Sequence, residues 1–362
     1  MMIGLTLGRY ILARFLFTIA TVFGTVFALI YLVDFLETMR RAGDSPGGTM
    51  ALVAQVTFYR TPAIAEQIFP FAVLFGSMAA LLQLSRKLEL VVARAAGISA
   101  WQFLQPGLFL ALALGILSVG VYNPVSAAMK QRASELEAAL FARNVQVAIN
   151  KEIWVRQRSV DGQAVIRAES AIEGTTGLAQ ATIFTFDEAG AFVERIEARE
   201  AVLHDGFWAL KDVRVVSERQ QPQSYAVYHL ASNLDPSQIR QTFTPAQSVA
   251  YWELPDTIQR TERAGLDATP YRLHLEGLTA RPLLFVAMVF VAASVSLRFF
   301  RFGGVAPMVL GGVAAGFLLY VANKVMQDLG TAGLVGPAVA AWFPAVVGSL
   351  LGTLALLYQE DG

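Results

Sequence analysis

Six apolar stretches of about 20 residues constrain this sequence more than any other feature. A helix needs about 20 mostly apolar residues to cross the hydrocarbon core of a bilayer, and each stretch meets that length. They form two groups of three, the first ending at Tyr122 and the second beginning at Pro282. The predicted spans are Leu12–Val33, Ala63–Leu84, Phe103–Tyr122, Pro282–Phe299, Val305–Met326 and Leu334–Tyr358. The chain is therefore predicted to be a multi-pass α-helical membrane protein.

Composition agrees with this prediction. The 362 residues are 55% hydrophobic and 15% charged, with a mean hydropathy of +0.50, which is too apolar for a soluble globular protein of this length. The first stretch lacks a small-residue cleavage site before a soluble region, so we expect it to stay as a membrane helix. Prolines are expected to interrupt the second and third spans, and glycines predict close packing of the fifth. These residues are Pro70 and Pro106, and Gly311, Gly312 and Gly316.

Lysine and arginine in the short loops predict how the spans cross the membrane. The basic residues before the first span, between the second and third, and between the fourth and fifth are Arg9, Arg14, Arg86, Lys87, Arg94, Arg298 and Arg301. The positive-inside rule places these loops in the cytoplasm. The first outer loop is also basic, at Arg40, Arg41 and Arg60, but Asp34, Glu37 and Asp44 offset it. Both termini are therefore predicted to be cytoplasmic, and the region between the third and fourth spans to lie outside.

That central region changes to a period-two pattern. Alternation typical of half-buried strands occurs at Glu152–Arg156, Ala181–Phe186, Phe192–Ala198 and Arg214–Ser217. Glycine-containing turns separate the strands, at Asp161-Gly162, Glu188-Ala189-Gly190 and Asp205-Gly206. The pattern predicts an antiparallel sandwich or open barrel with helical connections at Ala127–Phe141 and Tyr251–Leu266. The chain thus divides into three spans (1–129), a β insert with its connections (130–280) and three spans (281–362).

Two interpretations of the insert remain open from the residues alone. It can be a structural lid or assembly platform, or its sheet can enclose an apolar groove that accepts a lipid acyl chain. Alternation does not distinguish a filled core from an open one.

The sequence lacks the residues and motifs that several kinds of catalysis and metal binding require. Cysteine is absent, which excludes thiol catalysis and thiolate metal sites. No P-loop motif and no G-x-S-x-G motif occurs, and His204, His229 and His274 are isolated from one another, so they are predicted to be surface or loop residues. Net charge is zero, with no basic block to bind nucleic acid. We therefore predict no catalytic residues, no metal, no cofactor and no enzymatic activity.

The predicted cytoplasmic stretch Leu84–Trp101 carries the most information. Its apolar residues recur at helical spacing and its charges fall on other faces, which predicts a short amphipathic helix that Gly97 ends. The helix can rest on lipid headgroups, or it can couple the spans to a cytoplasmic ATPase by seating in a groove. Both interpretations stand on the residues alone.

Three features together resemble a known family: the run ELVVARAAGIS, the opening RYILARFL followed by VDFLETMRRAG, and the layout of three spans, a β insert and three spans. The chain is similar over nearly its whole length to the lipopolysaccharide export permeases of the LptF/LptG (YjgP/YjgQ) family, and its first span and loop are more like the LptG branch. The resemblance implies an inner-membrane ABC transporter in which one LptF-type and one LptG-type permease pair with an LptB-type ATPase dimer and an LptC-type partner. It also implies a periplasmic β-jellyroll-like domain that passes lipopolysaccharide towards a periplasmic bridge.

The resemblance also implies roles for individual residues. ATPase contact falls on Glu89, Arg94 and Gly97, and lipopolysaccharide contact on Asp34, Arg40, Arg41, Lys130, Arg132, Phe317 and Tyr320. Arginine binds phosphate through two hydrogen bonds, which suits a lipid A headgroup. A basic family position before Val33-Asp34 is Tyr31 here, so the charge pattern differs. The arginines can instead bind ordinary phospholipid, and the aromatic residues can face lipid.

The predicted function is that of a permease subunit that extracts lipopolysaccharide from the inner membrane. The alternative is a membrane-anchored periplasmic scaffold without transport activity. A secondary transporter is disfavoured because spans four to six hold almost no ionisable residue between their ends.

Overall fold

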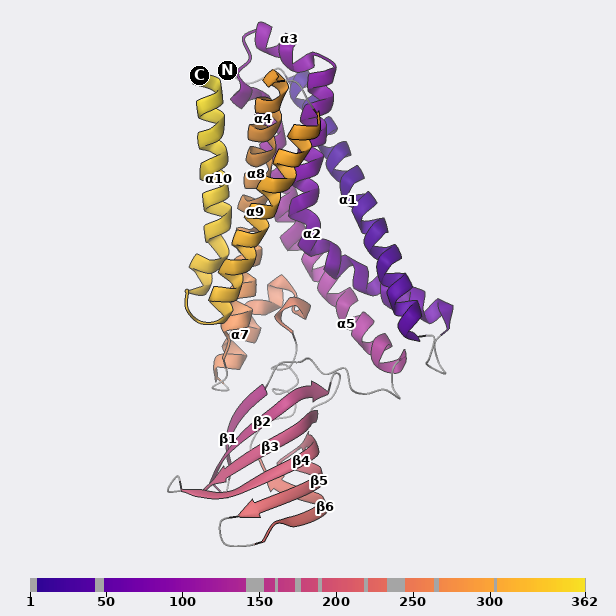
Figure 1. Cartoon of the computed structure of the whole chain (residues 1–362), viewed down its shortest axis with the longest axis vertical. Helices are drawn as coiled ribbons and strands as arrows, with labels where there is room; N and C mark the ends of the chain where they lie inside the picture. Colours follow the sequence, from indigo (N-terminus) through magenta and orange to yellow (C-terminus); the bar gives the residue numbers. More distant parts are fainter. Residues whose placement is uncertain are drawn as a thin grey trace.

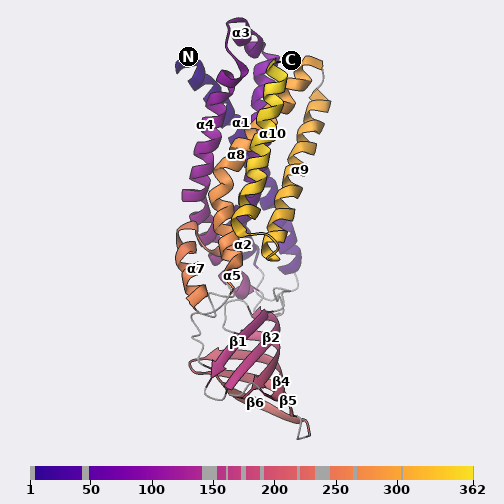
Figure 2. The same ribbon diagram turned by 90° about the vertical axis from the view of Figure 1, so that its left-hand side faces the viewer.

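The structure is a computed structural model, and two groups of elements stand out in it (Figure 1). Long helices stand side by side, and a β-sheet lies beyond one end of them. Both termini and the short helix α3 lie at the opposite end, as Figure 2 shows from a second direction. The described residues are 5–42, 49–140, 153–159, 162–172, 177–187, 191–217, 221–232, 245–263, 267–302 and 305–361.

The long helices confirm the six predicted spans, since six helices are long and apolar enough to cross a membrane. Five of them are α1 (Leu5–Ala42), α2 (Met50–Arg86), α8 (Thr269–Phe302), α9 (Val305–Thr331) and α10 (Pro337–Asp361). The third span is a continuous rod of α4 (Ala100–Leu117), the π-helix η1 (Ser118–Tyr122) and α5 (Asn123–Leu140). The helices run past the predicted ends because backbone hydrogen bonding continues where the apolar composition stops.

The prolines do not interrupt the spans as predicted. Pro70 lies inside α2 together with Pro62, and Pro106 lies inside α4. Proline removes one backbone donor, and in a packed bundle of membrane helices neighbouring groups and small local adjustments satisfy the carbonyl that it frees. The irregularity in the third span is the π-helix η1, which changes the hydrogen-bonding pattern without ending the helix.

Glycines set the closest helix contacts. A Cβ at Gly312 or Gly316 of α9 would lie 2.3 Å from the Met78 side chain or 2.5 Å from that of Leu74 in α2, so the prediction of close packing is confirmed at these two positions. The approach at Gly115 of α4 is to backbone, because a Cβ there would lie 2.4 Å from Cα of Pro282 in α8.

Gly115→Ala is therefore expected to destabilise the protein by about 1–3 kcal/mol, since the backbone of α8 must move to admit one methyl group. Thermal unfolding in detergent measures the effect. Gly24→Ala in α1 is the matched control, because nothing lies within 4 Å of that position. An unchanged midpoint for Gly115→Ala would contradict the close approach of α4 and α8.

The insert forms one six-stranded antiparallel sheet with the strands in chain order, which confirms the predicted antiparallel β insert. The strands are β1 (Ile153–Ser159), β2 (Gly162–Ile172), β3 (Gly177–Phe186), β4 (Phe192–His204), β5 (Phe207–Ser217) and β6 (Gln223–Ala231). Gly162 and Gly206 adopt φ of +117° and +87°, as the predicted turns require. The turn at 188–190 lies outside the described residues. β2 and β6 were not predicted, and β6 is exposed on both faces over residues 223–227.

The sheet curls until its first and last strands approach each other. The buried Gln157 of β1 donates from Nε2 to the carbonyl of Ala231 in β6, at 3.2 Å. Its Oε1 accepts from Nε1 of the fully buried Trp208 at 3.0 Å and from Oγ of Ser232 at 2.7 Å. Of the two forms that the sequence left open, the single curled sheet corresponds to the open barrel. Its apolar core includes Ile166, Ile183, Ile196 and Leu210.

Within the described residues, helical segments precede and follow the sheet in the chain, in the regions where the sequence predicted helical connections. The first connection is α5, the end of the third span. The second, residues 245–263, is here called the connector. It contains the 3-10 helices η2 (Ala246–Ser248) and η3 (Tyr251–Glu253), and α7 (Leu254–Arg263). Phe141 and residues 264–266 lie outside the described part.

Candidate functional site

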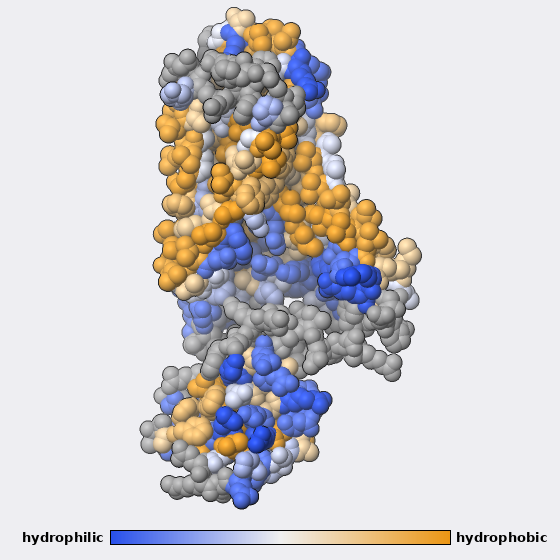
Figure 3. Space-filling view, viewed as in Figure 1, coloured by the Kyte–Doolittle hydropathy of each residue, from blue (hydrophilic) through white to orange (hydrophobic). Residues whose placement is uncertain are grey.

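A cavity of about 540 Å³ lies between α2, α5, α8, α9 and the connector. One part of its wall is apolar and includes Phe71, Leu284 and Leu319. The other part is polar and charged, with Lys130, Glu66, Arg281, His274, Lys324 and Asp328. Figure 3 shows hydrophilic surface gathered between two apolar faces, on the side of the bundle nearest the sheet. The cavity can therefore hold a ligand that is part charged and part apolar.

A buried ion pair forms part of the polar wall. Nη1 of Arg281 in α8 lies 2.5 Å from Oε1 of Glu66 in α2, and these side chains are only 15% and 9% exposed. The same carboxylate oxygen accepts from Nδ2 of Asn123 at 2.9 Å, and Arg281 also donates to Oγ of Ser118 at 3.4 Å. Charges this deep in a helical bundle are stable only when paired and hydrogen-bonded, so the pair fixes α2 and α8 against the third span.

His274 corrects a prediction. It is neither a surface nor a loop residue, because it lies in α8 and lines the cavity, and its Nε2 atom is buried without a hydrogen-bond partner. Within the described residues, no group of three or more histidine, aspartate and glutamate side chains is placed to hold a metal ion.

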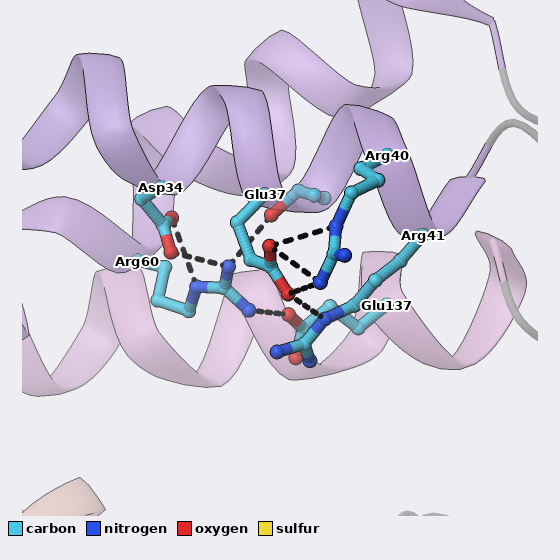
Figure 4. Close-up of polar contacts among 7 residues, drawn as sticks. Asp34, Glu37, Arg40, Arg41, Arg60 and Glu137 are labelled. Carbon is cyan, nitrogen blue, oxygen red and sulfur yellow. Dashed lines mark hydrogen bonds and ion pairs between the residues drawn. The ribbon is translucent and has the colours of Figure 1, made fainter.

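A second charged cluster joins α1, α2 and α5 near their sheet-side ends (Figure 4). Arg60 of α2 donates from Nε to Asp34 at 3.0 Å and from Nη2 to Thr38 at 2.7 Å, and it also pairs with Glu137 of α5. In the same view Glu37 holds both Arg40, at 3.1 Å, and Arg41, at 2.8 Å. Both of these arginines remain largely exposed.

The predicted helix over Leu84–Trp101 is shorter in the structure. α2 continues to Arg86, α3 spans Glu89–Ala95 and α4 begins at Ala100. Leu88 adopts φ +61° and Gly97 φ +81°, so the chain turns sharply on either side of α3 and the ends of this stretch join the neighbouring spans. Gly97 ends the helical stretch as predicted.

The surface of α3 has an apolar part that does not pack on the protein. Leu90 and Ala93 are buried against the bundle, whereas Leu88, Val91 and Val92 are exposed. Tyr10 of α1 donates from its hydroxyl to Oε1 of Glu89 at 2.9 Å, which ties α3 to the first span. The result is a fixed apolar knob at the end of the bundle farthest from the sheet.

Comparison of the sequence with known proteins identifies the family. Residues 9–359 match the family described as "Lipopolysaccharide export system permease LptF/LptG". The chain belongs to this family. The "Lipopolysaccharide export system permease protein LptG" of Escherichia coli K12 is 24% identical over 350 residues, which covers 94% of each chain. The protein of the same name from Haemophilus influenzae is 23% identical over 360 residues, or 97% of this chain and 96% of its own length.

Membership of the LptF/LptG family and the six apolar helices together indicate a multi-pass inner-membrane protein. The relatives are named as permeases of an export system, and the LptG name agrees with the branch that the first span and loop resemble.

The residues to which the LptF/LptG resemblance pointed lie in three places. Glu89, Arg94 and Gly97 lie on or beside α3. Lys130 and Tyr320 both line the cavity, where Tyr320 packs on Phe71 with ring centroids 5.6 Å apart. Outside the cavity lining lie Asp34 with Arg40 and Arg41, the largely exposed Arg132, 4.0 Å from Glu135, and Phe317, which is 61% exposed on α9.

Sequence reasoning missed the residues that organise the two charged clusters: Glu66, Arg281 and Arg60. One signal was present, since Glu66 is a lone carboxylate in an otherwise apolar predicted span. Such a residue normally faces the bundle interior and has a partner. The identity of that partner, 215 positions away, is not a local property of the sequence.

Proposed function

We propose that this chain is the LptG-type permease subunit of an ABC transporter that extracts lipopolysaccharide from the inner membrane and passes it to a periplasmic bridge. The observation that carries the proposal is the cavity, because it pairs an apolar wall with a charged one at the sheet-side end of the spans. A lipid with phosphorylated sugars and several acyl chains needs both surfaces.

In this proposal the headgroup phosphates meet Lys130 in the cavity, and Arg40, Arg41 and Arg132 at its approach. The acyl chains lie along α9, where Phe317 and Tyr320 offer aromatic surface beside the apolar wall. Asp34 acts indirectly, since its carboxylate is an anion that holds Arg60. The sheet side is then periplasmic, and α3 and both termini are cytoplasmic.

The driving force comes from outside this chain in the proposed cycle. An LptB-type ATPase dimer seats on the α3 knob, with Glu89 and Arg94 at the contact and Gly97 shaping the turn behind it. An LptF-type permease completes the lipid pathway, an LptC-type protein joins the complex, and the curled sheet receives the lipid. ATP-driven closure does work only if the closed state binds the lipid more weakly than the open state does.

Photocrosslinking in vesicles that contain the partner subunits tests this cycle. A photoreactive residue is placed at Tyr320 in the cavity, at Phe317 or Arg41 outside the cavity lining, or at Phe184 in β3. We expect crosslinks to lipopolysaccharide at the membrane positions without ATP and at Phe184 only with ATP. Leu354 of α10 is the matched control for Phe317, because the two residues are 63% and 61% exposed and neither lines the cavity, whereas Phe317 alone lies on α9, three residues before the cavity-lining Tyr320.

Two other outcomes are informative. Equal crosslinking at Leu354 and Phe317 would mean that the membrane positions sense bulk lipid only. No lipopolysaccharide crosslink at any position would contradict the proposal and favour the scaffold function.

A further inference from the structure

The connector, residues 245–263, is docked on the third span rather than hanging freely from the sheet. Its Val249, Leu254 and Ile258 share one apolar core with Val119 of η1 and Leu278 of α8. Its first residues, Pro245–Gln247, also line the cavity. The segment that leads from the sheet back into the membrane therefore touches both the π-helix and the cavity.

Two polar contacts fix the connector to the third span, one to the π-helix and one to Asn123, the first residue of α5. Nε1 of Trp252 donates to the carbonyl of Gly120 at 3.2 Å, and the backbone N–H of Tyr251 donates to Oδ1 of Asn123 at 2.9 Å. A π-helix changes the hydrogen-bonding register of its helix by one residue, and such segments frequently mark functional sites within long helices. Here the irregular turn is the place where the connector attaches.

Asn123 reaches in two directions at once. Its side chain is 1% exposed, and while Oδ1 accepts from the connector, Nδ2 donates to Glu66, the partner of Arg281 in the cavity wall. A hydrogen-bonded chain thus runs from Arg281 through Glu66 and Asn123 to the connector. Both the oxygen and the nitrogen of the amide are hydrogen-bonded. If Glu66 shifts, either Asn123 moves with it and changes its contact to Tyr251, or a buried polar group loses its partner.

We propose that Asn123 is a positioning residue for transport. Through it, binding of lipid in the cavity changes the position of the connector and hence that of the sheet. The inference rests on the proposed function. A phosphate-bearing headgroup beside Arg281 draws the guanidinium towards itself, Glu66 follows, and Asn123 changes its hold on Tyr251. The π-helix is the element that yields, and the sheet is released to take the lipid. No part of this role requires Asn123 to touch the lipid.

Asn123→Ala in the complete transporter tests the proposal, with photoreactive residues at Tyr320 and Phe184 as the two readouts. We expect the ATP-independent crosslink at Tyr320 to stay within about twofold of the unaltered protein, because the cavity wall keeps its groups. The ATP-dependent crosslink at Phe184 should fall by about tenfold or more, because the link from Glu66 to Tyr251 is lost. A tenfold loss corresponds to about 1.4 kcal/mol of coupling free energy.

Gln131→Ala is the matched control. Gln131 of α5 donates from Nε2 to the carbonyl of Ser248 at 3.1 Å, so the variant removes another side-chain contact to the connector without touching the ion pair. Both crosslinks should keep their native yield. An equal loss at Phe184 in both variants, or no loss in Asn123→Ala, would overturn the proposal. Absence of the Tyr320 crosslink in the unaltered protein would instead overturn the proposed function.

A reversible tether gives a second test that does not depend on removing Asn123. The chain has no cysteine, and a Cβ at Gly120 would lie 3.9 Å from Cζ2 of Trp252, with nothing else within 4 Å. Gly120→Cys with Trp252→Cys can therefore be joined by a short bis-methanethiosulfonate reagent, which forms a reducible disulfide with each cysteine and releases methanesulfinate. The tethered protein should load lipid at Tyr320 but not at Phe184 until the tether is reduced. Equal transfer before and after reduction would show that the connector need not move.

Discussion

Val92→Asp should abolish co-purification of the permease with the proposed LptB-type ATPase and reduce lipid-stimulated ATP hydrolysis by about 30-fold or more. Val92 is 66% exposed on α3, beside the exposed Leu88 and Val91. An apolar anchor at the centre of an interface is worth about 2 kcal/mol or more, and a carboxylate in its place also has to be desolvated. A loss of 2 kcal/mol corresponds to about 30-fold in affinity.

The geometry of α3 makes this effect local. Leu90 and Ala93 hold the helix on the bundle, and Tyr10 binds Glu89, so Val92 can be changed without disturbing the core. Leu334→Asp is the control, since Leu334 is 74% exposed in the turn between α9 and α10 at the sheet-side end. It should retain the ATPase. Native ATPase binding by Val92→Asp would show that α3 is not the coupling surface.

Arg281→Leu is expected to cost about 3–5 kcal/mol of stability, because it leaves the Glu66 carboxylate buried without its charged partner. The measurement is the unfolding midpoint of the purified protein in detergent. Replacing both members, Glu66→Leu with Arg281→Leu, should recover most of the loss, since no charge then stays buried.

Arg272→Leu provides a control on the same helix. Arg272 lies 2.5 Å from Glu262, the same distance as in the buried pair, but these side chains are 55% and 42% exposed. Exposed ion pairs contribute only about 0–1 kcal/mol, so this variant should change the midpoint little. If the two arginine variants were equally destabilised, burial of the Glu66–Arg281 pair would not be the cause.

The spans, strands β1, β3, β4 and β5, and the turns at Gly162 and Gly206 were predictable from sequence because each depends on neighbours along the chain. About 20 consecutive apolar residues are sufficient to predict a span, and Gly162 and Gly206 mark hairpins through their own backbone freedom. Prediction from neighbouring residues failed where the same residues can adopt more than one backbone conformation. Pro70 and Pro106 sit within continuous helices because surrounding helices support the backbone, and the stretch Leu84–Trp101 breaks at Leu88 to form a seven-residue helix.

The sequence by itself therefore determined the membrane class, the six spans, the antiparallel insert and, through its motifs, the LptF/LptG family. Only the tertiary structure decided which side chains meet. Asp34 accepts a hydrogen bond from Arg60, and Glu66 pairs with Arg281, which is 215 positions away. Such pairs depend on the rotation and axial shift of one helix against another. Helices that are apolar on most sides do not encode these in their hydropathy, so only the packed bundle fixes them.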